Sequence, residues 1–160
     1  MLKLNRKSFW MSPAEGQLSD DEFVEQARVL IDKNSSVYVG TDSMLRGDTC
    51  IFATVIAFHN NAANVATYYY KKFKVCNAEY KNIKNKITEE VNLSVQAAQV
   101  MSNAFPMTPV EVHVDIGASK ENKTRIMMST VSGWVAGMGY DLKIKPDSWA
   151  SSSIADNHTK

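Results

Sequence analysis

Two aspartates each end a run of apolar, β-branched residues, in the segments SVYVGTDSM and VEVHVDIG. Asp42 lies in the first segment and Asp115 in the second. Aspartate disfavours strands and a buried carboxylate without a partner costs free energy, so both positions need a physical reason. One reason is an Asx turn at each position, since Ser43 and Gly117 lie close by. The other is a cage of carboxylate ligands for a divalent cation such as Mg²⁺ or Mn²⁺.

A third carboxylate lies on a long amphipathic helix that we predict from about Glu79 to Asn103. With about 100° per residue, Glu90 falls about 60° from the centre of the apolar stripe, whereas Glu89 points nearly opposite. We therefore expect Glu89 to face solvent and Glu90 to lie at the margin of the buried face. There Glu90 either reaches the protein edge or a lysine, or it faces Asp42 and Asp115 as a third metal ligand.

The last segment, KIKPDSWASSSIADNHTK, contains two further polar candidates. A terminal helix is expected after Pro146, with Asp147 as its N-cap. Asp156 and His158 then lie at the far end of this helix, where a negative charge opposes the helix dipole. Asp156 is therefore either part of a solvated, frayed tail or a fourth acid of the cage.

A mixed sheet would bring these side chains together. Three strands are predicted at 37–41, 49–58 and 65–75, joined by short turns that favour an antiparallel meander. If the first strand is joined to the strand at 110–116 through the long helix, the two run parallel and adjacent. Asp42 and Asp115 then lie near the carboxyl ends of neighbouring strands, the usual place for a site in such a sheet.

The remaining elements complete an α/β domain. Residues 1–18 are expected to form an irregular lead-in, followed by an N-terminal helix at which Ser19 and Glu22 have capping-box spacing. After the 110–116 strand we expect a helix at about 122–136 and a strand at 142–144. The prediction is one domain over 1–160, with a lead-in and helix over 1–34 and a core over 35–160. Its core is a mixed five-stranded sheet in the order βββαβαβα.

Length and composition set mild limits. The 160 residues are 44% hydrophobic and 22% charged, with a net charge of +1, so any nucleic-acid contact needs a local basic patch. The first ten residues lack the apolar stretch of a signal peptide, and no apolar run is long enough to span a bilayer. A cytoplasmic protein without membrane contact is therefore expected. Cys50 and Cys76 are interpreted as small buried thiols, with a disulfide left open.

The segments VGTDSM, KITEEVNLSVQAA and VEVHVDIG, and the final block from GWVAGMGYDLKIKPDSW to the end, resemble the YkuK-type family of predicted RNase H-like proteins. The similarity runs from about Val37 to Lys160. It implies an RNase H-like fold whose acids come from the first strand, the first helix, the fourth strand and the last helix. The matching residues here are Asp42, Glu90, Asp115 and Asp156, with Asp147 as a competitor for the fourth place.

The chemistry that this resemblance implies is hydrolysis of phosphodiester bonds in RNA, DNA or a hybrid by a metal-dependent nuclease. Two Mg²⁺ or Mn²⁺ ions about 3.5–4 Å apart would be held by the acids. His158 would bind a phosphate or assist proton transfer. Two alternatives remain: a catalytically silent RNase H-like fold that serves as a nucleic-acid-binding or assembly module, and a resolvase-like activity on branched DNA.

Two segments are candidates for nucleic-acid contact. Lys120, Lys123 and Arg125 follow Asp115 and would bind backbone phosphates, or they form an ordinary solvated helix start. YYYKKFK interleaves aromatic residues with lysines as a nucleic-acid surface does. In the proposed strand order, however, this strand is the sheet edge, and its lysines are better explained as a guard against edge pairing.

Overall fold

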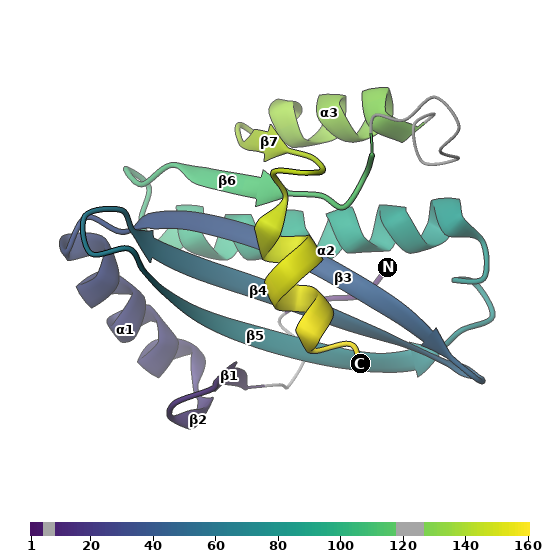
Figure 1. Cartoon of the computed structure of the whole chain (residues 1–160), viewed down its shortest axis with the longest axis horizontal. Coiled ribbons are helices and arrows are strands. Elements are labelled where there is room, and N and C mark those ends of the chain that lie inside the picture. The colour runs from purple at the N-terminus through teal and green to yellow at the C-terminus, as the bar shows by residue number, and fades with distance from the viewer. Residues whose placement is uncertain (5–8, 118–126) are drawn as a thin grey trace.

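The computed structural model describes residues 1–4, 9–117 and 127–160. A seven-stranded mixed sheet runs through it in the order β2-β1-β5-β4-β3-β6-β7 (Figure 1). The strands are β1 (Trp10–Ser12), β2 (Gly16–Leu18), β3 (Ser36–Arg46), β4 (Thr49–Asn60), β5 (Val65–Cys76), β6 (Val110–His113) and β7 (Asp141–Lys143). Strands β3, β4 and β5 form the predicted antiparallel meander, and β6 pairs parallel to β3. The mixed α/β architecture is confirmed.

The prediction of five strands is wrong by two, because the N-terminal lead-in is not irregular. Its β1–β2 hairpin adds to the sheet beyond β5, with Met11 opposite Tyr70. Strand β5 is therefore not the sheet edge, and Lys71 on it is buried rather than an exposed guard. The buried and partly buried residues of β1 do alternate along Trp10–Ser12, but three residues are too few for such a pattern to predict a strand.

The helices cover both faces of the sheet. Helix α1 (Asp20–Asp32) begins at the predicted capping box, in which Ser19 and Glu22 each accept from the other's backbone N–H. Helix α2 (Ile83–Ala104) lies behind the sheet in Figure 1, and η2 (Ala150–Ala155) crosses in front of it. Helix α3 (Met128–Gly137) lies beside β7.

Strand β3 contributes alternate side chains to the two faces, as the pleat requires. Val37 and Val39 enter the main apolar core, whereas Tyr38 belongs to a second cluster with Val55 and Trp149. The same alternation continues along β3 into its polar half. Neighbouring residues there consequently contact different helices.

Several element boundaries differ from the sequence predictions. Strand β3 continues to Arg46, so Asp42 lies within the strand and not at its end. The terminal helix starts at Trp149, where Ser148 supplies the first carbonyl acceptor, so Asp147 is not the N-cap. The predicted start of the helix at 122 lies outside the described residues.

Both cysteines are free thiols. Cys50 is buried as expected. Cys76 at the end of β5 is exposed, so the prediction that it is buried is wrong. In the part of the chain that the structure describes, no helix combines the length and apolar character needed to cross a membrane.

Candidate functional site

Asp42 lies where β3 extends beyond its parallel neighbour. The pairing with β6 runs from Val37 opposite Val110 to Gly40 opposite His113, so Asp42 is two residues past the last paired position. Its side chain is on the η2 face and is 8% exposed. Burial raises the pKa of Asp42 to about 6, although a hydrogen bond from the Ser43 backbone N–H opposes this shift.

Glu90 lies on the buried face of α2, against the opposite face of β3. It is 5% exposed and accepts a hydrogen bond from Ser43 Oγ, while Lys86 Nζ lies 3.8 Å from its Oε1. Burial raises the pKa of Glu90 to about 8, against the opposing effects of Lys86 and Ser43. Repulsion from Asp42 and Asp115 adds to the increase. Near pH 7 this carboxyl group is therefore mostly protonated.

Asp115 follows β6 by two residues, in a segment tied to β7 by a hydrogen bond from Val114 N to Lys143 O. Its side chain is 24% exposed, and its Oδ1 lies 3.0 Å from Lys145 Nζ. Within the described residues this buried oxygen accepts no hydrogen bond, so the ion pair is its polar contact. Lys145 is half exposed, which leaves it free to move away from the carboxylate.

The terminal segment folds back onto Asp42. Thr159 is fully buried, and its Oγ1 donates to Asp42 Oδ2 at 3.2 Å. Asp156 is close enough to Asp42 that their repulsion contributes to the raised pKa of Asp42, and it also pairs with Lys160 at 3.0 Å. At the helix C-terminus, Asp156 therefore lies near another acid, and the lysine one turn later partly neutralises it.

His158 takes a different direction. Its Nε2 lies 3.0 Å from the Tyr68 hydroxyl, and its ring stacks on Tyr70 with the centroids 3.8 Å apart. Burial lowers the pKa of His158, with a smaller effect from Lys72, so the ring is neutral near pH 7. His158 therefore packs against β5, whereas its neighbour Thr159 contacts Asp42.

The acids approach one another from both faces of the sheet. Asp42 lies on the η2 side of β3 and Glu90 on the α2 side, just past the last residue of β3 that pairs with β6, and the charge of Asp42 adds to the raised pKa of Glu90. Among the described residues, no three His, Cys, Asp or Glu side chains are grouped closely enough to hold a metal ion. Glu90 was expected to face Asp42 and Asp115 directly, but it reaches β3 from the face opposite to the Asp42 side chain.

Three residues that position the site were missed. A Cβ on Gly40 would lie 2.6 Å from Ser151 N, so glycine is what allows the terminal helix to approach β3 this closely. His113 is fully buried, accepts from Ala150 N through Nδ1 and contacts Glu111 through Nε2, which anchors the start of that helix. Thr159 is the third. A glycine within an otherwise β-branched run was the one available signal for such a close approach.

The prediction that Glu89 faces solvent is wrong. Glu89 is 3% exposed and accepts a hydrogen bond from the Leu2 backbone N–H, because the first residues of the chain cover this side of α2. The candidate phosphate contacts Lys120, Lys123 and Arg125 lie outside the described residues.

The donor set has the chemistry that a divalent cation requires. The carboxylates at positions 42, 90, 115 and 156 are hard oxygen donors, and a cation would remove the burial and repulsion costs that now raise the pKa of Asp42 and Glu90. Lysine ammonium groups lie close to both Glu90 and Asp115, with Lys86 Nζ 3.8 Å from Glu90 Oε1 and Lys145 Nζ 3.0 Å from Asp115 Oδ1.

Comparison with known proteins agrees with this fold. The Ribonuclease H-like family model matches residues 21–160. The chain is also similar to the uncharacterized protein YkuK of Bacillus subtilis (strain 168), with 26% identity over 166 residues that cover 92% of this chain and 94% of YkuK. Both comparisons agree with the resemblance seen in the sequence. The chain belongs to the Ribonuclease H-like family.

Proposed function

We propose that the protein is a divalent-metal-dependent nuclease whose active site is the open edge of β3. The observation that carries this proposal is that acids from two other elements, Asp42 on β3 and Asp115 after β6, lie close enough to the buried Glu90 of α2 to add to its raised pKa. Like charges collected in a buried place cost stability, and binding a cation is the usual compensation. The family provides the second support, since its fold suggests nucleic acid as the partner.

The proposed ligands of two Mg²⁺ or Mn²⁺ ions are Asp42, Glu90, Asp115 and Asp156. When bound, the ions would activate a water molecule and stabilise the charge that develops on the leaving oxygen of the phosphodiester. Thr159 would keep the Asp42 carboxylate in one orientation, and Ser43 would do the same for Glu90. These two hydrogen bonds matter because a carboxylate that is already oriented loses less conformational entropy when it binds a metal ion.

Two further residues, His158 and Lys145, would contact the substrate phosphate or transfer a proton. His158 is neutral near pH 7 and is the candidate for phosphate contact or proton transfer, provided that it leaves its contacts with Tyr68 and Tyr70. Lys145 would be displaced from Asp115 when a cation binds, and its freed ammonium would then be available to a substrate phosphate.

The direct experiment is a cleavage panel of RNA, single- and double-stranded DNA, RNA–DNA hybrid and branched DNA with Mg²⁺, Mn²⁺ or EDTA. We expect cleavage of at least one substrate with metal, its loss in EDTA, and its loss in Asp42→Asn. The matched control is Asp48→Asn in the exposed β3–β4 turn, which should cleave like the wild type. Cleavage that survives Asp42→Asn would contradict the proposal.

A binding measurement tests the metal site separately. Because Glu90 is mostly protonated near pH 7, cation binding must release a proton from it. Calorimetric titration with Mn²⁺ at pH 7, in two buffers of different ionisation enthalpy, should show this release in the wild type and its reduction in Glu90→Gln. A titration with no heat of binding in either buffer would argue against a metal site.

The alternative function is a catalytically silent member of the family that binds nucleic acid or assembles with a partner. The observation in its favour is that Lys86 and Lys145 already compensate Glu90 and Asp115. In that case, nucleic acid would bind equally well in EDTA and in Mn²⁺, and no substrate of the panel would be cut.

A further inference from the structure

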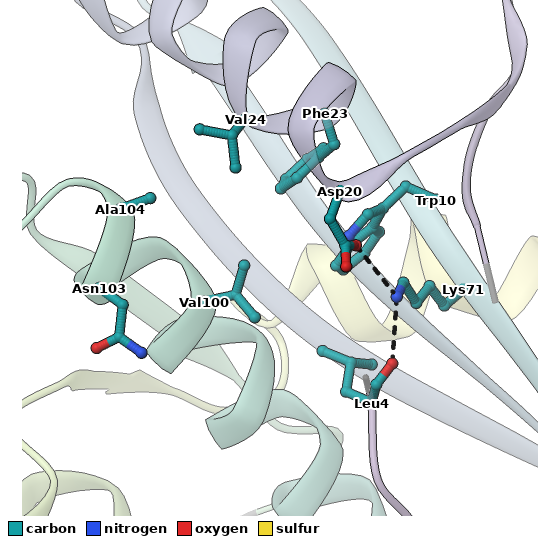
Figure 2. A pocket seen from close by; sticks show the side chains of 9 residues that line it. All are labelled: Leu4, Trp10, Asp20, Phe23, Val24, Lys71, Val100, Asn103 and Ala104. Atoms are coloured by element: carbon teal, nitrogen blue, oxygen red, sulfur yellow. Dashed lines mark hydrogen bonds and ion pairs between the residues drawn. The ribbon is translucent and has the colours of Figure 1, made fainter. Parts of the chain in front are cut away.

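A pocket of about 410 Å³ lies between the N-terminal segment, α1 and the C-terminal half of α2 (Figure 2). Val100 in its wall lies ten positions after Glu90 on α2, which corresponds to about 15 Å along the helix axis. The pocket is therefore distinct from the acidic site. Its apolar walls include Trp10, Phe23 and Ala104.

The polar end of the pocket is a buried lysine. Lys71 is 2% exposed, and its Nζ lies 3.2 Å from the Leu4 carbonyl oxygen and 3.6 Å from Asp20 Oδ1. The ammonium also lies 4.9 Å from the centroid of the Trp10 ring. Figure 2 shows the ammonium end of Lys71 between Asp20 and Leu4, directed into the space that Val100 borders on the other side.

These contacts satisfy the lysine only in part. An ammonium has three N–H donors, and two acceptors contact Lys71 within the described residues. Burying a charged group whose hydrogen bonds are incomplete costs free energy, and burial does lower the pKa of Lys71. Asp20 is a weak partner, because its side chain is 72% exposed and water competes for it.

We propose that this pocket is a binding site for a small molecule with an apolar, aromatic-sized body and one anionic group. The body would occupy the space between Phe23 and Val100, and the anion would accept the Lys71 N–H that has no acceptor among the residues that the structure describes. The volume lies within the range of small-molecule sites, and a mostly apolar wall with a few polar groups, here Lys71 and Asp20, is their usual composition. A charge-assisted hydrogen bond shielded from water supplies the selectivity for an anion.

Asp20 would compete with a bound anion for Lys71, and this competition can be tested. Its carboxylate shares Lys71 with the ligand, so an anion must displace it into solvent, where it is already largely exposed. Removing this competitor with Asp20→Asn should strengthen anion binding. If Lys71 and Asp20 formed only a structural ion pair, loss of Asp20 would not improve binding of any ligand.

The test uses two probes that differ mainly by one charge, 8-anilinonaphthalene-1-sulfonate and the uncharged N-phenyl-1-naphthylamine. Each is titrated into the full chain, and binding is followed by NMR at the Trp10 indole N–H and the methyl groups of Val100 and Ala104. We expect saturable shifts at these three residues with the anionic probe. Its dissociation constant should be at least about tenfold lower than that of the uncharged probe, as one charged hydrogen bond implies.

Variants assign the effect to the pocket. Lys71→Met should weaken the anionic probe about tenfold or more and leave the uncharged probe bound, which also shows that the variant is folded. Lys72→Met changes the exposed neighbour and is the matched control, with unchanged binding. Ala104→Phe should fill the pocket and abolish binding of both probes.

Three results would overturn the proposal. The first is the absence of saturable shifts at Trp10 and Val100 in the wild type. The second is equal weakening of the anionic probe by Lys71→Met and Lys72→Met. The third is weaker binding of the anionic probe to Asp20→Asn than to the wild type.

Discussion

Replacing Glu90 by glutamine should stabilise the protein in a manner that depends steeply on pH. Burial raises the pKa of Glu90 to about 8 from an ordinary value of 4.5. The folded protein therefore holds a proton on Glu90 over a pH range in which the unfolded chain has released it. Stability from this group is fully present below pH 4.5 and is lost as the pH rises through about 8.

The size of the effect follows from the same two values. The difference between about 8 and 4.5 corresponds to about 5 kcal/mol of unfolding free energy that the wild type loses on going from low pH to above pH 8. Glutamine cannot ionise, and its carbonyl oxygen can still accept from Ser43 Oγ. The variant therefore avoids this loss, while it gives up the weak contact with Lys86.

The assay is urea unfolding in EDTA at pH 5 and pH 9 for the wild type and Glu90→Gln. The two proteins should have similar unfolding free energies at pH 5, and the variant should be more stable by several kcal/mol, on the order of 5, at pH 9. Groups distant from Glu90 titrate alike in both proteins, so their contributions cancel in the difference. Glu79→Gln, at an exposed position before α2, is the control and should track the wild type. A difference that stays constant or shrinks with rising pH would refute the reasoning.

Three further perturbations test neighbouring parts of the site. Asp42→Asn should raise stability in EDTA at pH 8 by up to about 3 kcal/mol, because the pKa of Asp42 is raised from 3.8 to about 6, and Mn²⁺ should then raise the Tm of the wild type more than that of the variant. Gly40→Ala should cost about 1–3 kcal/mol in urea unfolding, since the new Cβ would meet Ser151 N at 2.6 Å; a neutral result would mean that the terminal helix shifts freely. Thr159→Val removes a donor to the ionised carboxylate, so an NMR titration of Asp42 should show a higher pKa than in the wild type, and an unchanged value would exclude the contact.

Local patterns in the sequence were sufficient for the order of most elements. The capping box at Ser19 and Glu22 involves residues three apart, and it defines the start of α1 as predicted. The long β-branched runs of β3, β4 and β5 are separated by short turns, which leaves an antiparallel meander as the simplest pairing. The C-terminal block resembled the family that the comparisons then showed.

Periodicity was less informative about which polar residues are buried. It placed Glu90 near the buried face of α2, but it also assigned Glu89 to solvent, where the Leu2 backbone covers it from 87 positions away. Helical periodicity reports which side of a helix is apolar. It contains no information about a distant segment that packs on the other side.

The candidate site depends on contacts of the same long-range kind. The length, charge and strand pattern of the sequence determined an α/β domain and singled out the aspartates at positions 42 and 115. Only the tertiary structure decided that β6 stops short of Asp42, that Glu90 reaches β3 from the opposite face, and that Thr159 returns across 117 positions to contact Asp42. Burial and repulsion raise a pKa only when side chains distant in the chain share one low-dielectric space, and packing, not local propensity, creates that space.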